Sequence, residues 1–492
     1  MSFLKKLLAL ATFSALNLGV LQPLEASFSN RHLEVISSDL SLEALSLEKA
    51  QDYLMQHHPK LLSILASEES SHQVYLQAWS AWLPSVSASA SYLDNQAPGK
   101  YSSGIGVSQT LFDNSSYWNV RLRKIDWAMA KAQVASLKND LLYELRATYY
   151  GLIVTMQEVK AAEENVELLQ ASYQREKERF EIGDVTSFQM NQSKVALSNS
   201  LTDLYAARSN LKKAYQSLFV ALGLFPSQEP TRLSLSEAEI PVHHISLVKD
   251  LLESLEAHQL EAGLSEKSIW QANHTLFSLQ TRQRYIDRAL EKSPQVVIGV
   301  AKVDRSKLSA KSKLGEYLPS VSASLAYSNA LDRSTNNPFE GRYDSTVGVS
   351  LQWTLLDGFA RERRLSQAKW NKISDEEGYR QLTHQTKQNV LSSFYELEEA
   401  CQTYVASSLG VKLAQEAMEQ ASHQRTWGVI SPLEYREAAA LLTKSKRDFA
   451  KSSYQLIMAY YKLVYNTGED VAGDYVEIDE AIDHAKMQMM KR

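Results

Sequence analysis

Few side chains in this sequence are spaced for catalysis or for metal binding. Histidines form two adjacent pairs, His57–His58 and His243–His244, but neighbours in sequence do not share a helix face, and no third ligand lies near either pair. The single cysteine, Cys401, excludes an intramolecular disulfide and a cysteine-cluster metal site, and we expect it to be a buried helix residue. No Ser-His-Asp, P-loop or Rossmann pattern occurs, so we expect neither an enzyme nor a bound cofactor or metal.

The charged side chains form groups that are more informative about function than the histidines and the cysteine. Glu434 and Glu437 are three positions apart, which places both carboxylates on one face of a helix. The pair is either a solvated helix face or a functional group of charges. Two basic groups follow predicted strands, and we interpret them as a solvated belt, with a role in selectivity as the alternative: Arg121, Arg123, Lys124, Arg361, Arg363 and Arg364. The net charge of −5 gives no basic footprint for nucleic acid, so no such partner is expected.

The composition favours long helices. The 492 residues include only 18 glycines and 11 prolines, which is below average usage, so turns are few. A mean hydropathy of −0.30, with no apolar run of about 20 residues beyond the N-terminus, excludes a bundle of membrane-spanning helices.

The N-terminus is arranged like a secretory signal peptide. Two lysines precede an apolar stretch over residues 7–21, and the small residue Ala26 follows, so we predict cleavage after Ala26. No cysteine comes next, so a lipid anchor is not expected. We therefore assign 1–26 to the signal peptide and 27–44 to a separate N-terminal segment.

The chain contains one internal repeat. Residues 83–89 (LPSVSAS) recur as 318–324, and residues 110–113 (TLFD) recur as 354–357 (TLLD). Matches in the same order indicate a duplicated supersecondary unit. The predicted boundaries are 45–223 for repeat 1, 224–278 for an inter-repeat equatorial segment, 279–468 for repeat 2 and 469–492 for a C-terminal tail.

Each repeat contains two stretches with a period of two. Small polar and apolar residues alternate over 85–93 and 104–111 in repeat 1, and over 321–327 and 347–355 in repeat 2. This predicts one β-hairpin per repeat and four strands per chain. Strands of this length span a bilayer when tilted, with the small polar face toward water and the apolar face toward lipid. A hairpin half-buried on a soluble core fits the pattern equally well.

After each hairpin the apolar residues recur every seven positions, which is typical of a coiled coil. In repeat 2 this stripe is apolar at every position but the last: Leu397, Tyr404, Val411, Met418 and Arg425. The stripes break at 181–187 and 426–432, where a glycine can end one helix and a hydroxyl residue can cap the next. We predict a helix over 114–181 and an antiparallel helical hairpin in each repeat. Residues 45–82 are also predicted to be helical, with a break near Pro59, so each repeat contains a helix, a β-hairpin and a long helical hairpin in that order.

Four strands are too few to close a barrel, for which about eight is the practical minimum, and open edges are not tolerated in lipid. If the hairpins enter a membrane, the chain must therefore oligomerise. The predicted fold is mostly α with a small β part. It consists of duplicated long antiparallel helical hairpins and four strands per chain, and a trimer would bring together twelve strands and twelve helix columns.

The sequence resembles the outer-membrane efflux channel (TolC) family. The shared features are the duplicated layout, Leu83-Pro84-Ser85 opening a strand, Leu111-Phe112-Asp113 closing the next, and glycine turns at Gly183 and Trp427-Gly428. The resemblance implies a homotrimer in the outer membrane of a Gram-negative-type cell. In this implied trimer four strands per chain contribute to a 12-stranded trimeric β-barrel, and the helical hairpins form an α-barrel. That α-barrel is a periplasmic tunnel that docks a periplasmic adaptor and an inner-membrane pump. It implies a non-enzymatic exit duct for tripartite efflux or type I secretion. The alternative is a non-transport periplasmic coiled-coil adaptor or envelope scaffold.

The resemblance also implies a gate at the helical turns. The family often places acidic residues six and nine positions after the second glycine, around the closed aperture. Those positions are Glu434 and Glu437 here, and the equivalent places in repeat 1 hold Gln189 and Gln192. Three copies would place six carboxylates around a narrow opening that attracts cations.

Closure and docking are also implied at these turns. Some relatives use a latch whose positions correspond to Gln189, Ile430 and Arg425 here, so closure is expected to rest on packing or on a different polar set. The tip turns and the adaptor docking surface are implied to include Gly183, Gly428, Thr186 and Ser431.

Overall fold

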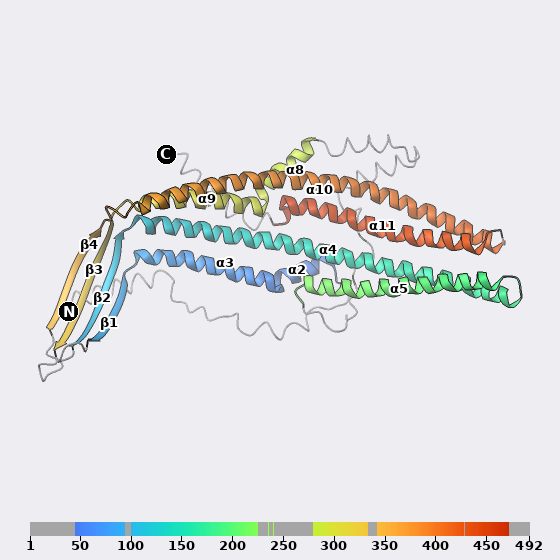
Figure 1. The fold of residues 1–492 in the computed structure, drawn as a ribbon, viewed down its shortest axis with the longest axis horizontal. Coiled ribbons are helices and arrows are strands. Elements are labelled where there is room, and N and C mark those ends of the chain that lie inside the picture. The colour runs from blue at the N-terminus through green and yellow to red at the C-terminus, as the bar shows by residue number, and fades with distance from the viewer. Residues whose placement is uncertain are drawn as a thin grey trace. The chain divides into compact units, whose positions relative to one another are not determined.

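The computed structural model describes residues 45–93, 100–224, 235, 240, 279–332, 342–427 and 429–471. Within them the chain is mostly helical with four strands, as predicted (Figure 1). The described residues within Ser67–Ala130 and Gly299–Tyr379 form a sheet unit, and those within Leu42–Ala66, Lys131–Ile298 and Arg380–Arg492 form a helical unit. The predictions for 1–26, 27–44, Gly428, most of 224–278 and most of the tail fall outside the described residues.

The sheet unit contains four antiparallel strands in the order β1-β2-β3-β4 (Figure 1). They are β1 (Ser85–Leu93), β2 (Lys100–Phe112), β3 (Ser320–Asp332) and β4 (Arg342–Gln352). Small side chains share one face of the sheet, as in the row Ser87, Gly106, Ala326 and Thr346. Larger apolar side chains share the other face, where Val86, Ile105 and Val347 are exposed. The strand pairing thus places each half of the alternating pattern on its own face.

The last strand ends earlier than its pattern predicts. The alternation continues through Trp353 and Leu355, yet β4 ends at Gln352. Within the described residues β4 pairs with β3, whose first residue Ser320 lies opposite Gln352, and Pro319 before it has no N–H to donate. The prediction of a strand as far as Leu355 is therefore wrong at its end, because the partner strand stops first.

The helices follow the predicted order in each repeat. Before the first hairpin lie α2 (Leu47–His57), α3 (Pro59–Ala78) and the 3-10 helix η1 (Trp79–Trp82); before the second lie α8 (Leu279–Lys292) and α9 (Pro294–Gly315). After the hairpins come α4 (Asn114–Glu181), α5 (Ser187–Ala221), α10 (Ala360–Thr426) and α11 (Pro432–Thr467), then η3 (Glu469–Val471). Helix α4 has the predicted bounds. No helix in the described part of the chain has both the length and the apolar character needed to cross a membrane.

The seven-residue stripes form the core of the helical unit. Val159 of α4 packs with Leu204 of α5. Met418 of α10 packs with Tyr435 of α11, and Leu168 of α4 joins this second cluster. The stripes therefore pair the helices within each hairpin, α4 with α5 and α10 with α11 (Figure 1), and they also join one hairpin to the other.

Two joints connect the ends of the helical hairpins to earlier helices of the same unit. At the first joint Gly223, after α5, has φ +77° and lies against His58. At the second joint Gly468, after α11, has φ +69° and lies against Ser293. The two joints occupy corresponding places in the two repeats, so the histidine of the first joint is replaced by a serine in the second.

We expect the histidine at the first joint to make stability depend on pH. His58 is 4% exposed, and its Nδ1 accepts the N–H of Lys60 at 3.2 Å. Burial lowers the pKa of His58, the charge of Lys60 lowers it further, and Glu144 opposes both. Because the unfolded chain then binds protons more readily, the stability present above pH ~6.5 is lost as the pH falls below that value.

We expect His58→Ser, which introduces the residue type of Ser293 at the second joint, to reduce this loss of stability at low pH. The measurement is the thermal unfolding midpoint of the detergent-solubilised protein between about pH 7 and about pH 5. The neighbouring substitution His57→Ser should keep the wild-type slope. Equal slopes for H58S and the wild type would contradict the prediction.

Candidate functional site

Local hydrogen bonds fix the turn between α4 and α5. Gly183 has φ +80°, a conformation that favours glycine, and the N–H of Asp184 donates to the carbonyl of Arg179 at 2.8 Å. Thr186 is the N-cap of α5: its Oγ1 accepts the N–H of Gln189, and the Oε1 of Gln189 accepts the N–H of Thr186 at 3.0 Å. The sequence predicted that a hydroxyl residue after the glycine caps the next helix, and Thr186 forms this cap.

The turn between α10 and α11 has the same kind of reciprocal helix cap. Ser431 Oγ accepts the N–H of Glu434 at 3.3 Å, and Glu434 Oε2 accepts the N–H of Ser431 at 2.7 Å. Pro432 occupies the first turn of α11, where its missing N–H costs nothing. Glu434 therefore has a structural role in its own turn, whereas Glu437, one helical turn further on, is exposed without such a contact.

The tips of the two hairpins meet beside these residues. Arg436 of α11 donates from Nη1 to the backbone carbonyl of Gln192 at 3.0 Å and from Nε to the carbonyl of Pro432 at 3.2 Å. The structure thus brings the backbone of α5 and the start of α11 together within one chain. Sequence reasoning misses Arg436, since a single arginine on a helix carries no pattern.

A buried ion pair crosses between the hairpins close to the same turns. Arg425 Nη2 of α10 donates to Glu176 Oε1 of α4 at 2.8 Å, and the two side chains are 8% and 1% exposed. The guanidinium carbon of Arg425 lies 4.5 Å from the centre of the Tyr435 ring. Arg179 approaches the same carboxylate oxygen of Glu176 at 3.7 Å. Burial lowers the pKa of Arg425, and the Glu176 carboxylate opposes that change.

More exposed ion pairs join the same two hairpins further along. Lys446 of α11 lies 2.5 Å from Glu164 of α4, and Lys451 lies 3.7 Å from Glu158. Such pairs contribute only about 0–1 kcal/mol each because water and salt screen them. Their effect is to favour one pairing of α4 with α11, whereas the loss of one partner from the buried pair has the larger cost.

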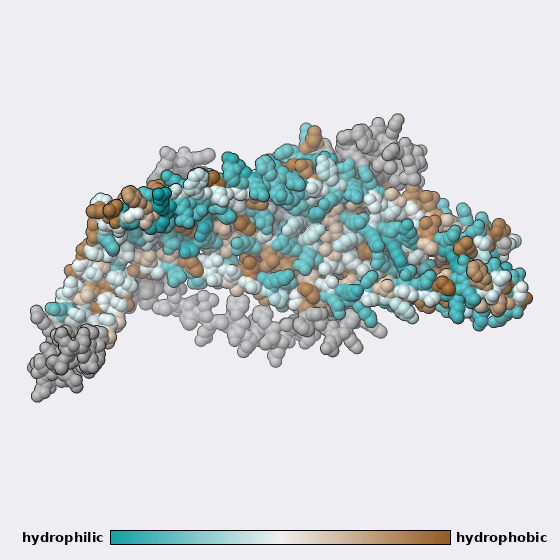
Figure 2. Space-filling view, viewed as in Figure 1, coloured by the Kyte–Doolittle hydropathy of each residue, from teal (hydrophilic) through white to brown (hydrophobic). Residues whose placement is uncertain are grey.

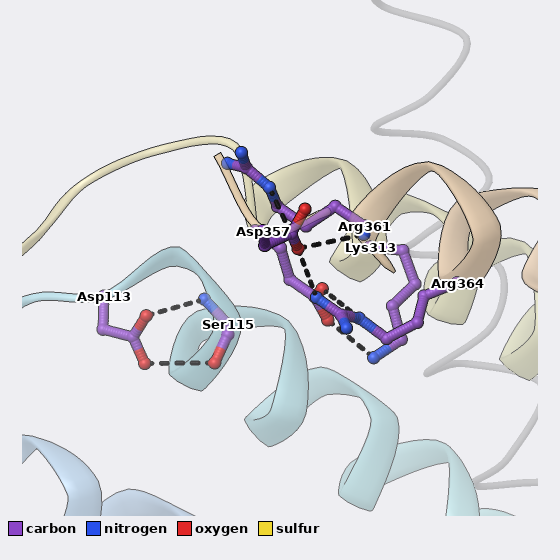
Figure 3. Close-up of polar contacts among 7 residues, drawn as sticks. Asp113, Ser115, Lys313, Asp357, Arg361 and Arg364 are labelled. Atoms are coloured by element: carbon purple, nitrogen blue, oxygen red, sulfur yellow. Dashed lines mark hydrogen bonds and ion pairs between the residues drawn. The ribbon is translucent and has the colours of Figure 1, made fainter. Parts of the chain in front are cut away.

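The two strand-to-helix junctions of the sheet unit use an aspartate in different ways (Figure 3). After β2, Asp113 accepts the N–H of Ser115 at 3.1 Å and caps the start of α4. After β4, Asp357 Oδ2 accepts the N–H of Arg361 at 3.0 Å and lies 3.3 Å from Arg364 Nη2. A carboxylate suits a helix N-terminus in both places, but Asp357 also contacts the guanidinium groups of Arg361 and Arg364.

The basic residues after β4 do not form a uniform solvated belt. Arg361 is buried and donates from Nη2 to the carbonyl of Leu355 at 3.0 Å. Arg364 pairs with Glu316 at 2.8 Å, whereas Arg363 is exposed. The prediction of a solvated belt is therefore wrong for Arg361, because the carbonyl of Leu355 and the nearby Asp357 hold its guanidinium inside the junction.

The described residues contain no group of three or more His, Cys, Asp and Glu side chains that could hold a metal ion. His57 Nδ1 lies 3.3 Å from the carbonyl of Tyr53, and the pair His243–His244 lies outside the described residues. Cys401 is buried, and burial, together with the charge of Glu398, raises the pKa of its thiol to about 12. This thiol stays protonated and unreactive at neutral pH.

Known proteins share this architecture. The sequence pattern of the family described as "Outer membrane efflux protein" matches residues 52–224 and 285–469. The chain is 23% identical over 482 residues to the outer membrane protein TolC of Vibrio cholerae, covering 93% of this chain and 98% of that protein. It is 21% identical over 376 residues to the outer membrane efflux protein BepC of Brucella suis, covering 75% and 72%. Its fold is similar to the crystal structure of the Campylobacter jejuni CmeC outer membrane channel, with a TM-score of 0.67, 15% identity and coverage of 87% and 89%.

Paired helical hairpins, each preceded by a strand hairpin, define a channel-forming class of envelope protein. The chain belongs to the outer membrane efflux protein family, the TolC-like channels. It is an outer-membrane efflux channel with a periplasmic helical extension, and it is a transport protein rather than an enzyme, as predicted. The alternative of an adaptor or envelope scaffold is set aside, because the family match extends over both repeats.

Proposed function

We propose that three copies of this chain assemble into one continuous duct with a 12-stranded β-barrel and a helical barrel. The observation that carries this proposal is the sheet itself: within the described residues β1 and β4 are edge strands, with partners on one side only. A four-stranded sheet is too small to close on itself, and lipid does not tolerate open backbone edges. Pairing of β4 of one copy with β1 of the next satisfies both edges.

Cross-linking between the edge strands tests this assembly. In a Cys401→Ala background, Ala88→Cys on β1 combined with Val349→Cys on β4 places a thiol on each edge of the same face. We expect a short bis-maleimide to give covalent dimers and trimers in detergent, and light scattering to report three chains per particle. Ala88→Cys alone should give neither product. A monomer by light scattering, with no cross-linking of the paired variant, would overturn the proposal.

The tip turns supply a gate in this proposal. Glu434 and Glu437 are exposed at the start of α11, and Gln189 and Gln192 are exposed at the start of α5. In a trimer the glutamates place six carboxylates around the helical end of the duct, where they attract cations and repel anions. The two glutamines contribute polar lining without charge.

Removing the charge while keeping the cap tests the gate. Gln189 caps α5 with its amide oxygen, so Glu434→Gln keeps the cap of α11 and removes only the charge. We expect Glu434→Gln with Glu437→Gln to lower the cation-to-anion permeability ratio of single channels several-fold, with unchanged thermal stability. Glu434→Ala is the control that loses the cap as well. An unchanged permeability ratio in the double variant would show that these carboxylates are only a solvated helix face.

The tips also form the proposed docking surface for a periplasmic adaptor and its inner-membrane pump. Ile182 and Trp427 are 79% and 81% exposed beside the turns, and apolar side chains so exposed mark an interaction surface. Of the turn residues expected at this surface, the described ones are Gly183, Thr186 and Ser431. The duct then carries cargo that the pump delivers, either small toxic molecules or secreted proteins. Trp427→Ser is expected to abolish co-purification of a cross-linked adaptor while leaving the assembled channel intact.

A further inference from the structure

The turn from β4 to α10, residues 353–359 (the β4–α10 turn), contains backbone strain that its counterpart in repeat 1 lacks. Phe359 has φ +66°, a left-handed conformation that costs free energy for any residue with a side chain. After β2 the helix α4 begins at Asn114, directly behind Asp113, so the corresponding residue Ser115 is helical. The shorter strand-to-helix turn of repeat 1 forms without this strain, and a backbone outlier of this kind is grounds for proposing a function.

Exposed apolar side chains cover this turn. Leu355, Leu356 and Phe359 are 73%, 77% and 67% exposed, and Figure 2 shows apolar surface gathered where β4 meets α10. Trp353 and Leu355 continue, with a period of two, an exposed apolar row that runs along β4: Val347, Val349 and Leu351. The turn therefore extends the apolar face of the sheet beyond the last strand residue.

An exposed cation follows this turn in the sequence. Arg364 is held by Glu316 at 2.8 Å and by Asp357 at 3.3 Å (Figure 3). Arg363, its neighbour in the first turn of α10, is exposed, and no ion pair to it occurs among the described residues. Arg363 is thus available to an anion that comes from outside the chain.

We propose that the β4–α10 turn is a phospholipid anchor: Leu355, Leu356 and Phe359 insert among the acyl chains of the periplasmic leaflet, and Arg363 pairs with a headgroup phosphate. Aromatic and aliphatic side chains followed at once by a cation suit a bilayer interface. The row through Trp353 lies on the large apolar face of the sheet and not on its small polar face, which favours lipid as the occupant. The inference rests on the proposed placement of the sheet in the outer membrane.

Spin labelling tests the depth of the turn. In a Cys401→Ala background, nitroxide labels are attached to Phe359→Cys, to its repeat-1 counterpart Ser115→Cys, and to Val349→Cys on the apolar face of β4. The assembled channel is reconstituted in vesicles of phosphatidylethanolamine and phosphatidylglycerol. We expect the label at 359 to collide several-fold more with oxygen, relative to a water-soluble nickel complex, than the label at 115.

Each other outcome of this experiment contradicts a different statement. If the label at 349 is accessible to the nickel complex, the proposed placement of the sheet in lipid fails. If the label at 349 lies in lipid while the label at 359 is accessible to nickel, only the anchor fails. If the label at 359 is accessible to neither probe, a neighbouring copy covers the turn and the lipid proposal is overturned.

The headgroup contact has a separate test. Arg363→Gln is expected to lower several-fold the number of phosphatidylglycerol molecules that stay bound to the channel in native mass spectrometry. Lys369→Gln, which removes an exposed cation later on the same helix, is the control and should retain the wild-type number. Equal retention by both variants would remove Arg363 from the anchor.

Discussion

Replacing Glu176 with alanine is expected to separate the tips of the two helical hairpins and to raise the single-channel conductance. The carboxylate of Glu176 is the buried partner of Arg425, so its removal leaves a cation unpaired in a site from which water is largely excluded. Loss of one partner of such a pair costs about 3–5 kcal/mol. The local response that relieves this cost is movement of α10 away from α4, which lets water reach Arg425.

The measurement is conductance in planar bilayers, together with the rate of protease cleavage at the tips. Glu176→Leu combined with Arg425→Leu is the informative control, because a buried pair can be replaced by apolar side chains at little cost. That double variant should return toward wild-type conductance. Lys451→Gln, which removes an exposed contact to Glu158, should change neither quantity. Wild-type conductance and cleavage in Glu176→Ala would show that this pair does not hold the tips together.

Replacing Gly468 with alanine is expected to destabilise the helical unit strongly. Gly468 has φ +69°, and a Cβ built there would lie 2.7 Å from the backbone carbonyl oxygen of Lys292 and 3.0 Å from Pro294 Cδ. The left-handed backbone and the overlap with fixed atoms together cost about 2–4 kcal/mol. Gly223→Ala at the first joint should behave alike, since a Cβ there would lie 2.6 Å from Pro59 Cδ.

The thermal unfolding midpoint of the detergent-solubilised protein checks this expectation. Gly410→Ala is the matched control in the same unit: it lies within α10, and a Cβ there meets nothing within 4 Å. Because glycine in a helix is less stable than alanine by roughly 0.5–1 kcal/mol, this control should keep or raise the midpoint. If Gly468→Ala unfolded at the wild-type temperature, the second joint would not be the rigid contact that the structure shows.

Local chemistry made the element boundaries readable from the sequence. Helix α4 starts behind Asp113 and ends before Gly183, and both residues act on the backbone next to them. Thr186 and Ser431 cap the next helices through side chains only three residues away. Such signals depend on a few neighbouring residues, so no knowledge of the fold is needed to interpret them.

Contacts between distant residues were only partly readable. Arg425 was the one charged residue in an otherwise apolar stripe, but nothing in the sequence identified its burial or its partner Glu176 in the other repeat. The fate of Arg361 was likewise hidden, because its burial follows from the carbonyl of Leu355 and the nearby Asp357.

The sequence by itself determined the duplicated plan, the lengths of the helices and the two faces of the sheet, because periodicity and caps act over one or two turns of chain. The tertiary structure decided which charges are buried and where β4 ends for lack of a partner residue on β3. Those outcomes depend on the packing of α4 against α10 and α11, and on the edge of β3. The free energy of packing depends on both surfaces in contact, and the sequence of one surface does not identify the surface that packs against it.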